Sequence, residues 1–242
     1  DITIQATDDC LNAANSDLTD FEFTMNISGG SIHAYTTAGD GFDSNGDLTI
    51  SGGTVVVWSA NTADNQPLDA DGTITISGGT VLAAGGSGGM GMNLNATQPY
   101  VIIGNTGMGG QPGQPGQSGE QPTPPSGQQP EQSGEQPTPP SGQQPSQSGE
   151  QPSQPGQGTQ TNASVTAGST IHIQDADGNT LYTGTAPCNA SYFVFSSPEL
   201  TSGSSYTLYA ADTSVGSATA QTGTTSGNTP GGQPGGQPGS GE

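Results

Sequence analysis

The feature of this sequence that most constrains its fold is a corner, Ser-Gly-Gly, which occurs at residues 28–30, 51–53 and 77–79. A short segment of alternating apolar residues precedes each copy, and another follows it. A repeat of this length, with two short strands and a glycine corner, is typical of a parallel β-helix, in which each repeat forms one coil stacked about 4.8 Å from the next. An antiparallel sandwich is the alternative, but its strands would not need the corner copied in register.

Alternation within these strands predicts which side chains fill the interior of the coils, because successive side chains of a strand point to opposite faces. The segments after the corners form one wall, and the segments before them form the opposite wall. The predicted interior residues are Ile2, Ile4, Ile32, Ala34, Val55, Val57, Val81 and Ala83 on the first wall, and Met25, Ile27, Leu48, Ile50, Ile74 and Ile76 on the other. The Asp- and Asn-rich stretches between the walls are predicted to be turns.

The rest of the chain divides into three further zones, and every zone is all-β or low in complexity. Coils are expected over 1–107, and a Pro/Gly/Gln-rich insertion, expected to run as extended polyproline-type chain, follows at 108–161. The phrase QSGEQPTPPSGQQP occurs there twice, at 117–130 and 132–145. Residues 162–224 predict a small antiparallel β unit packed on the coils, with a hairpin turn at Asp177-Gly178. A Gly/Pro-rich tail ends the chain at 225–242.

The charge balance excludes several classes of partner. The 242 residues include 21 Asp and Glu but no Lys or Arg, and only His33, His172 and the N-terminal amine can become cationic. Nothing in the chain can neutralise phosphate, so nucleic acid and anionic membranes are excluded as partners. No transmembrane segment is visible, so we expect no membrane insertion. The missing targeting signal says little, because the chain opens in mid-strand and we expect a mature or excised fragment.

Carboxylates without basic partners must face water, accept backbone N–H bonds, become protonated or bind a metal. Alignment of the coils places Asn12, Asp43 and Asp69 in one column, with further acidic and amide side chains close by. Hard oxygen ligands suit Ca²⁺, so we predict a calcium-binding ladder whose number of ions stays open. The candidate ligands are Asp9, Asn12, Asp40, Asp43, Asn45, Asp47, Asp69 and Asp71. The alternative is that these residues only form turns and cap backbone amides.

A second column, on the outer face of the first wall, carries Tyr35 and Trp58. Two stacked aromatic rings form a flat surface of the kind that sugar rings pack against, so both are candidate carbohydrate-binding residues. Val56, Leu82 and Ala84 lie beside them, however. We therefore favour a face that is covered by another part of the same chain, either residues 162–224 or the insertion.

Three phrases carry a family resemblance: GDGFDSNGDLTISGGTVVVWS, NQPLDADGTITISGGTVLAAGG and the later YFVFSSPELTSGSSYTLYA. They resemble a family of secreted bacterial carbohydrate-binding, calcium-binding β-helix proteins that is related to the family 9 polysaccharide lyases. The resemblance covers the first and third zones. It implies a right-handed parallel β-helix that binds calcium through aspartates and adheres to plant-type polysaccharide, of the pectin or cellulose type, without cleaving it. The chain departs from the family in lacking early coils, in its long insertion and in having no Lys or Arg.

No enzyme activity is expected. The related lyases need a Lys or Arg to abstract the sugar proton, and this chain has neither. Paired carboxylates can hydrolyse glycosides, but these few short coils offer little groove to hold a sugar chain. Neither histidine stands in a context that suggests a partner for a nucleophilic serine.

Two functions follow, and the sequence leans slightly to the first. The first is an extracellular or cell-surface structural subunit of a bacterium, whose calcium-braced coils stack head to tail into an adhesive fibre through an open first coil that exposes Ile2, Ile4 and Leu11. The alternative is a monomeric polysaccharide-binding module. Cys10 and Cys188 separate the two, because an intrachain disulfide favours the module and an interchain disulfide favours the fibre. The sequence does not say which pairing forms, which polysaccharide is bound or what orders the insertion.

Overall fold

The computed structural model describes residues 1–15, 17–18, 20–62, 64–86, 92–104 and 163–225. These residues form strands, turns and bends, and none of them is helical. The described residues all belong to one unit of the chain. The predicted insertion at 108–161, and all but the first residue of the predicted tail at 225–242, lie outside the described residues.

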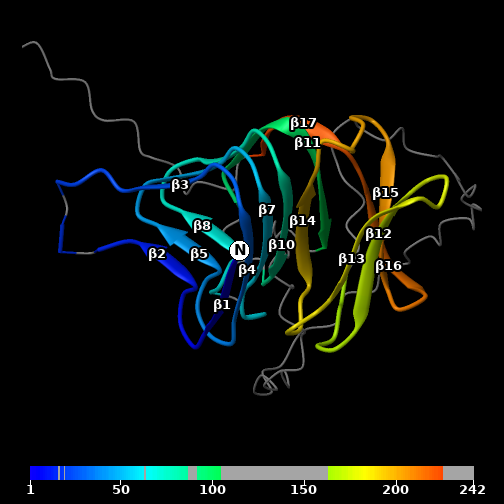
Figure 1. Ribbon diagram of the computed structural model, residues 1–242, viewed down its shortest axis with the longest axis horizontal. Helices are drawn as coiled ribbons and strands as arrows, with labels where there is room; N and C mark the ends of the chain where they lie inside the picture. Colours follow the sequence, from blue (N-terminus) through cyan, green and yellow to red (C-terminus); the bar gives the residue numbers. More distant parts are fainter. Residues whose placement is uncertain (16, 19, 63, 87–91, 105–162, 226–242) are drawn as a thin grey trace, which may run out of the picture. The chain divides into compact units, whose positions relative to one another are not determined.

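The described N-terminal part is a parallel β-solenoid, which confirms the predicted fold class (Figure 1). Its first wall consists of β1 (Ile2–Ala6), β4 (Ser31–Thr36), β7 (Thr54–Trp58) and β10 (Thr80–Gly85), which pair in parallel. Ile2 lies beside Ile32, Ile32 beside Val55, and Val55 beside Val81. This is the register that the repeat predicts.

The prediction of turns between two walls was wrong, because those stretches form a wall of their own. The second wall is a three-stranded parallel sheet of β2 (Leu11–Ala13), β5 (Phe42–Ser44) and β8 (Leu68–Ala70). The third wall consists of β3 (Thr24–Ile27), β6 (Asp47–Ile50), β9 (Ile74–Ile76) and the start of β11 (Leu94–Gly104). Phe42 and Leu68 are fully buried. Each short strand of the second wall therefore contributes an apolar side chain to the interior, and this burial outweighs the turn preference of the Asp beside it.

The interior of the solenoid is a continuous apolar core. The predicted inward residues of the first and third walls contribute to it, and Phe42 and Leu68 add the second wall. Ile2 is the exception: it was predicted to be inside but is 53% exposed, because β1 is the first strand of its wall and no coil covers it from the other side. A core of buried Val, Ile, Leu and Phe side chains is the main source of stability for coils that share few local contacts.

The repeated corner has a packing reason. Gly30, Gly53 and Gly79 all have positive φ, between 84° and 88°. A Cβ atom on Gly53 would lie 2.5 Å from the carbonyl oxygen of Gly30, and one on Gly79 would lie 2.5 Å from that of Gly53. All three glycines therefore supply the left-handed backbone. Gly53 and Gly79 also allow the close approach of the coil before them, whereas Gly30 has no atom within 4 Å of a Cβ position.

The last coil does not end in an open edge. β14 (Tyr192–Ser196) pairs antiparallel with β10 on one side and with the second half of β11 on the other. β17 (Gln221–Thr225) pairs with the first half of β11. Two strands from the C-terminal zone thus extend the sheet that the coils begin. The predicted boundary near residue 162 therefore does not separate two independent sheets.

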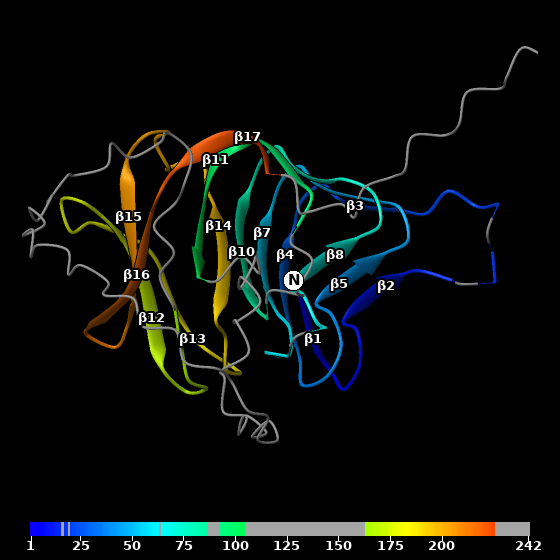
Figure 2. The same cartoon turned by 180° about the vertical axis from the view of Figure 1, so that it is seen from behind.

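A second sheet covers the outer face of the first wall (Figures 1 and 2). It has the order β13 (Thr180–Thr185), β12 (Thr170–Asp175), β15 (Ser205–Ala210) and β16 (Thr213–Thr219), all antiparallel. Val56, Trp58, Leu82 and Ala84 pack in one apolar cluster with side chains of this cover sheet and of β14. This confirms the predicted antiparallel β unit on the coils and the predicted cover of that face by residues 162–224. No helix suited to crossing a membrane occurs in the described residues.

Candidate functional site

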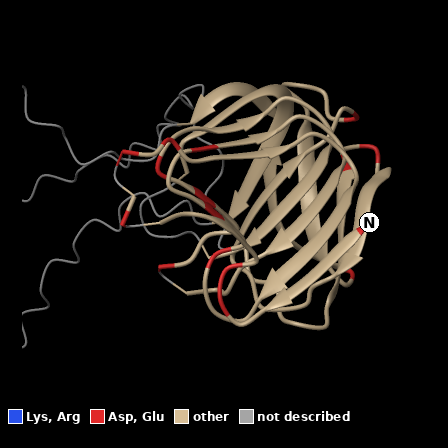
Figure 3. Cartoon of the chain, turned by 60° about the vertical axis from the view of Figure 1, so that its left-hand side comes forward, with Lys and Arg blue, Asp and Glu red and all other residues tan. Residues whose placement is uncertain are grey.

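The acidic column that the alignment predicted is present on the outer face of the second wall. Strand register places Asn12 of β2 beside Asp43 of β5, and Asp43 beside Asp69 of β8. Their strand neighbours Phe42 and Leu68 point into the core and are fully buried, so the polar side chains point outward. Figure 3 shows the acidic residues on turns and short strands of the described chain, with no Lys or Arg to balance them.

Three of the predicted metal ligands have a structural role. Asp9 Oδ1 accepts a hydrogen bond of 2.8 Å from the backbone N–H of Asp40, one coil further along. In the same way, Asp40 Oδ1 accepts from the N–H of Gln66, and Asp47 Oδ1 accepts from the N–H of Thr73 at 2.8 Å. These carboxylates link each coil to the next, which is the backbone-capping alternative that the sequence left open.

Asn12 and Asn45 also cap the backbone, because Asn12 Oδ1 accepts from the N–H of Ala14 at 2.8 Å and Asn45 Oδ1 accepts from that of Asn15 at 2.7 Å. The remaining predicted ligands accept hydrogen bonds only from uncharged amides. Asn12 Nδ2 donates to Asp9 Oδ2 at 2.8 Å and to Asp43 Oδ2 at 3.3 Å. Asp69 Oδ1 accepts from Gln66 Nε2 at 3.4 Å, and Asp71 Oδ2 accepts from Asn45 Nδ2 at 3.2 Å. Asp69 also accepts from the backbone N–H of Ala70, whereas the single long bonds to Asp43 and Asp71 leave most of the acceptor capacity of those two carboxylates free.

Without a bound cation, the partly buried carboxylates of the column repel one another. Burial raises the pKa of Asp43 to about 6, and the charges of Asp9, Asp69 and Asp71 add to the shift. Burial also raises the pKa of Asp40 to about 6, although the hydrogen bond from the Gln66 amide opposes this. Burial raises the pKa of Asp69, the hydrogen bond from the Ala70 backbone amide opposes this rise, and the charges of Asp71 and Asp9 add to it. A cation at the column would relieve this repulsion, and the protein has no side chain that can supply one.

The donor set fits calcium in its chemistry but is incomplete. Asp43 and Asp69 lie on neighbouring strands, which are spaced about 4.8 Å apart, and Asp71 follows closely in sequence. Within the described residues, no three His, Cys, Asp or Glu side chains are grouped closely enough to enclose a metal ion. Calcium takes roughly six to eight oxygen ligands and accepts water among them, so the protein would supply only part of its shell.

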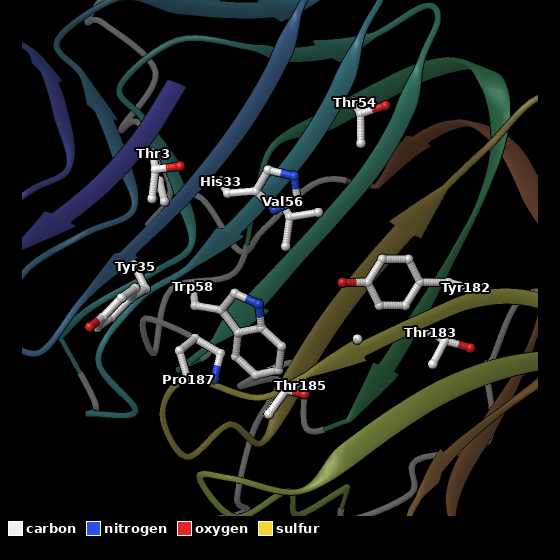
Figure 4. A pocket seen from close by; sticks show the side chains of 12 residues that line it. Thr3, His33, Tyr35, Thr54, Val56, Trp58, Tyr182, Thr183, Thr185 and Pro187 are labelled. Carbon is white, nitrogen blue, oxygen red and sulfur yellow. The ribbon is translucent and has the colours of Figure 1, made fainter. Parts of the chain in front are cut away.

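A groove of about 340 Å³ lies between the first wall and the cover sheet. One side carries Thr3, His33, Tyr35 and Trp58, and the other carries residues of β13 and the loop after it (Figure 4). The residues of the second side are Tyr182, Thr183, Gly184, Thr185 and Pro187. We call this site the aromatic groove.

The two predicted carbohydrate-binding residues both line the aromatic groove, but they do not form an open stacked platform. Trp58 is only 2% exposed, and its ring packs edge-on against Phe193 with centroids 5.9 Å apart. Tyr35 is half-buried, and its neighbour His33 is exposed. The cover sheet accounts for this, because it lies against the apolar side chains beside Trp58. Of the two, Tyr35 is therefore the side chain that a ligand can reach.

Sequence reasoning missed the second side of the groove. Tyr182 and the threonines beside it belong to an ordinary alternating strand, and nothing in the sequence signals that this strand lies opposite Tyr35 and Trp58. The pairing of β12 with β13, and the packing of the cover sheet, bring them there.

Cys10 and Cys188 are both free thiols. Cys188 Sγ donates a hydrogen bond of 3.4 Å to the carbonyl oxygen of Ser59. Burial raises the pKa of both thiols to about 11, and for Cys10 the charges of Asp9 and then Cys188 contribute. Since the thiolate is the reactive form, both are slow nucleophiles at neutral pH. A disulfide through Cys10 and Cys188, within one chain or between two, stays a prediction.

Comparison with protein-family profiles, with curated proteins and with solved structures finds no match to this chain. The resemblance to the carbohydrate-binding β-helix family therefore stays a prediction, and the site has to be interpreted from its own geometry.

Proposed function

We propose that this chain is a non-catalytic polysaccharide-binding module of an extracellular or cell-surface bacterial protein, with coils that Ca²⁺ braces. The observation that carries the proposal is the aromatic groove, in which Tyr35 and Trp58 of the coils meet Tyr182 of the cover sheet. Small-molecule sites are typically concave, mostly apolar and aromatic, with a few polar groups that fix orientation. The groove has this composition.

The chemistry of the groove suits a sugar ring. A pyranose presents C–H groups on its faces, which pack on aromatic carbon, and hydroxyl groups around its rim, which exchange hydrogen bonds with alcohol and imidazole groups. Tyr35 and Tyr182 offer the reachable aromatic carbon, with the buried Trp58 beneath them, and the threonines and His33 offer the polar partners.

Calcium would stabilise the coils rather than take part in a reaction. Asp43 and Asp69, which lie side by side on neighbouring strands, would contact it and water would complete its shell, because these two carboxylates have only neutral amide partners. The bound ion would supply the positive charge that the chain lacks. Asp9, Asp40 and Asp47 would keep their hydrogen bonds to the backbone of the next coil.

The head-to-tail fibre stays a prediction with less support. A following coil would have to pair with the free edge of β10, and β14 pairs with that edge. Electron microscopy with calcium and then with excess chelator tests it directly. Filaments that fray on chelation would restore the fibre as the main function, whereas single particles in both conditions would remove it.

Affinity electrophoresis in gels that contain plant polysaccharides tests the binding module. We expect the full chain to be retarded by at least one polysaccharide, and Tyr35→Ala to abolish the retardation. Tyr209→Ala is the matched control, because Tyr209 is also half-buried but does not line the groove. Free migration of the wild-type chain through every polysaccharide would contradict the proposal.

A further inference from the structure

We infer that the aromatic groove selects neutral sugars and rejects uronic acids, so that the ligand is an uncharged polysaccharide. This inference rests on the proposed function and names the substrate class of the same site. It goes beyond the expected pectin- or cellulose-type ligand, because it chooses between these two chemistries.

The lining of the groove contains no Asp, Glu, Lys or Arg. Its residues are Thr3, His33, Ala34, Tyr35, Thr54, Val56, Trp58, Tyr182, Thr183, Gly184, Thr185 and Pro187. His33 is the only one of them that can become a cation, and no Lys or Arg exists elsewhere in the chain to reach in. A sugar carboxylate is normally held by the bidentate fork of Arg or by Lys. The groove cannot supply either contact.

The field of the whole chain acts in the same direction. The net charge of −21 repels an approaching polyanion. This repulsion slows association and is screened only partly at physiological salt, where the Debye length is about 8 Å. A neutral polysaccharide meets no such barrier.

The aromatic side chains supply the attraction for a neutral sugar. Tyr182 packs against Phe195 with ring centroids 6.0 Å apart, and Trp58 packs against Phe193. These rings are held in place by the core beneath them, so they lose little conformational freedom when a ligand binds. A volume of about 340 Å³ lies at the low end of the roughly 300–1,000 Å³ of small-molecule sites. It suits a short stretch of sugar rings.

The test is isothermal titration calorimetry of the full chain with neutral tetrasaccharides (cello-, xylo- and manno-tetraose) and with tetragalacturonate, each in chelator and in calcium. We expect a neutral tetrasaccharide to bind equally in both buffers and to lose at least tenfold in affinity in Tyr35→Ala but not in Tyr209→Ala. In chelator, tetragalacturonate should bind at least tenfold more weakly than the best neutral ligand.

A gain of function sharpens the test. His33→Lys places a permanent positive charge on the exposed rim of the groove, whereas His172→Lys places the same charge on β12, outside the groove. We expect only His33→Lys to improve tetragalacturonate binding in chelator, by about tenfold. Equal improvement in both variants would show a general charge effect and overturn the groove as the selective element.

The outcomes separate the inference from the proposed function. Tight binding of tetragalacturonate in chelator that Tyr35→Ala removes would overturn neutral selection and leave the binding module intact. Uronate binding that needs calcium, resists Tyr35→Ala and is lost in Asp43→Asn would move the glycan site to the acidic column. If neither ligand class bound the wild-type chain, the proposed function itself would fail.

Discussion

The outer faces of the first and second walls of the solenoid differ sharply, although the same coils build both. Outside the first wall, Val56, Trp58, Leu82 and Ala84 are buried against the cover sheet. Outside the second wall, Asn12, Asp43 and Asp69 form a polar column that stays partly exposed. The inner faces of both walls belong to one apolar core.

This difference shows that the repeat determines the interior of each coil, whereas the outer faces are free to diverge. An inward side chain must fit its neighbours in the coils on both sides, so its size and polarity are strongly constrained. An outward side chain has only to suit what lies against it. One face has become a packing surface and part of a groove, and the other has become an acidic surface.

The largest expected effect comes from the apolar cluster on the outer face of the first wall, to which Phe193 of β14 belongs. Phe193→Ala should lower the free energy of unfolding by about 3–5 kcal/mol, because it leaves a cavity beside Trp58. Phe21→Ala is the matched control, since Phe21 is 66% exposed, and it should change stability by less than about 1 kcal/mol. Urea denaturation measures both. Equal losses would contradict the packing role of this face.

The corner glycines test how tightly the coils themselves are stacked. Gly53→Ala and Gly30→Ala both place a side chain at positive φ, but only Gly53 has a neighbouring backbone within reach of a Cβ atom. Gly30→Ala should cost about 1–2 kcal/mol for the left-handed conformation alone. Gly53→Ala should cost clearly more, and thermal unfolding gives the difference. If the two variants were equally stable, close stacking would not be the reason for the repeat.

The acidic face should make stability depend on pH in an unusual direction. Because the pKa values of Asp40 and Asp43 are raised from 3.8 to about 6, the folded chain binds more protons than the unfolded chain between these values. In chelator, the melting temperature should therefore be higher at pH 4 than at pH 7, with most of the loss as the pH rises through 6.

Calcium should reverse that loss at pH 7, since a bound cation replaces the protons. The double variant Asp43→Asn with Asp69→Asn should show a flatter pH profile and little response to calcium in differential scanning fluorimetry. A wild-type melting temperature at pH 7 that is the same with calcium and with chelator would contradict the calcium brace.

The smallest expected change in stability distinguishes aspartates that accept a hydrogen bond from the backbone of the next coil from those that contact only a side-chain amide. Asp47→Ala removes an acceptor for the Thr73 N–H and should cost about 1 kcal/mol, as for the loss of a capping side chain. Asp71→Ala removes a carboxylate that has only an amide partner, and in chelator it should leave stability unchanged or raised. Chemical denaturation in chelator decides between them, and equal losses would show that both carboxylates have the same structural role.

Much of the fold could be predicted from the repeat. The register of β1, β4, β7 and β10, the interior residues and the column of Asn12, Asp43 and Asp69 all follow from alternation and from the spacing of Ser-Gly-Gly. The second wall was missed because each of its strands is three residues long and contains Asp or Asn. At these positions the turn preference of the local sequence opposes pairing with the strands of neighbouring coils. The pairing prevails, but it joins residues far apart in the sequence, so a local pattern does not reveal it.

The sequence alone therefore determined a stack of coils with an acidic column, because both features recur in every coil and need no distant partner. It also indicated that the face around Trp58 needed a cover. Only the tertiary structure decided three further features. It decided which aspartates accept hydrogen bonds from the backbone of the next coil. It also decided that β14 pairs with β10 and that Tyr182 lies opposite Tyr35 across the groove. These contacts join residues far apart in the sequence without any repeat between them, so no local pattern records them.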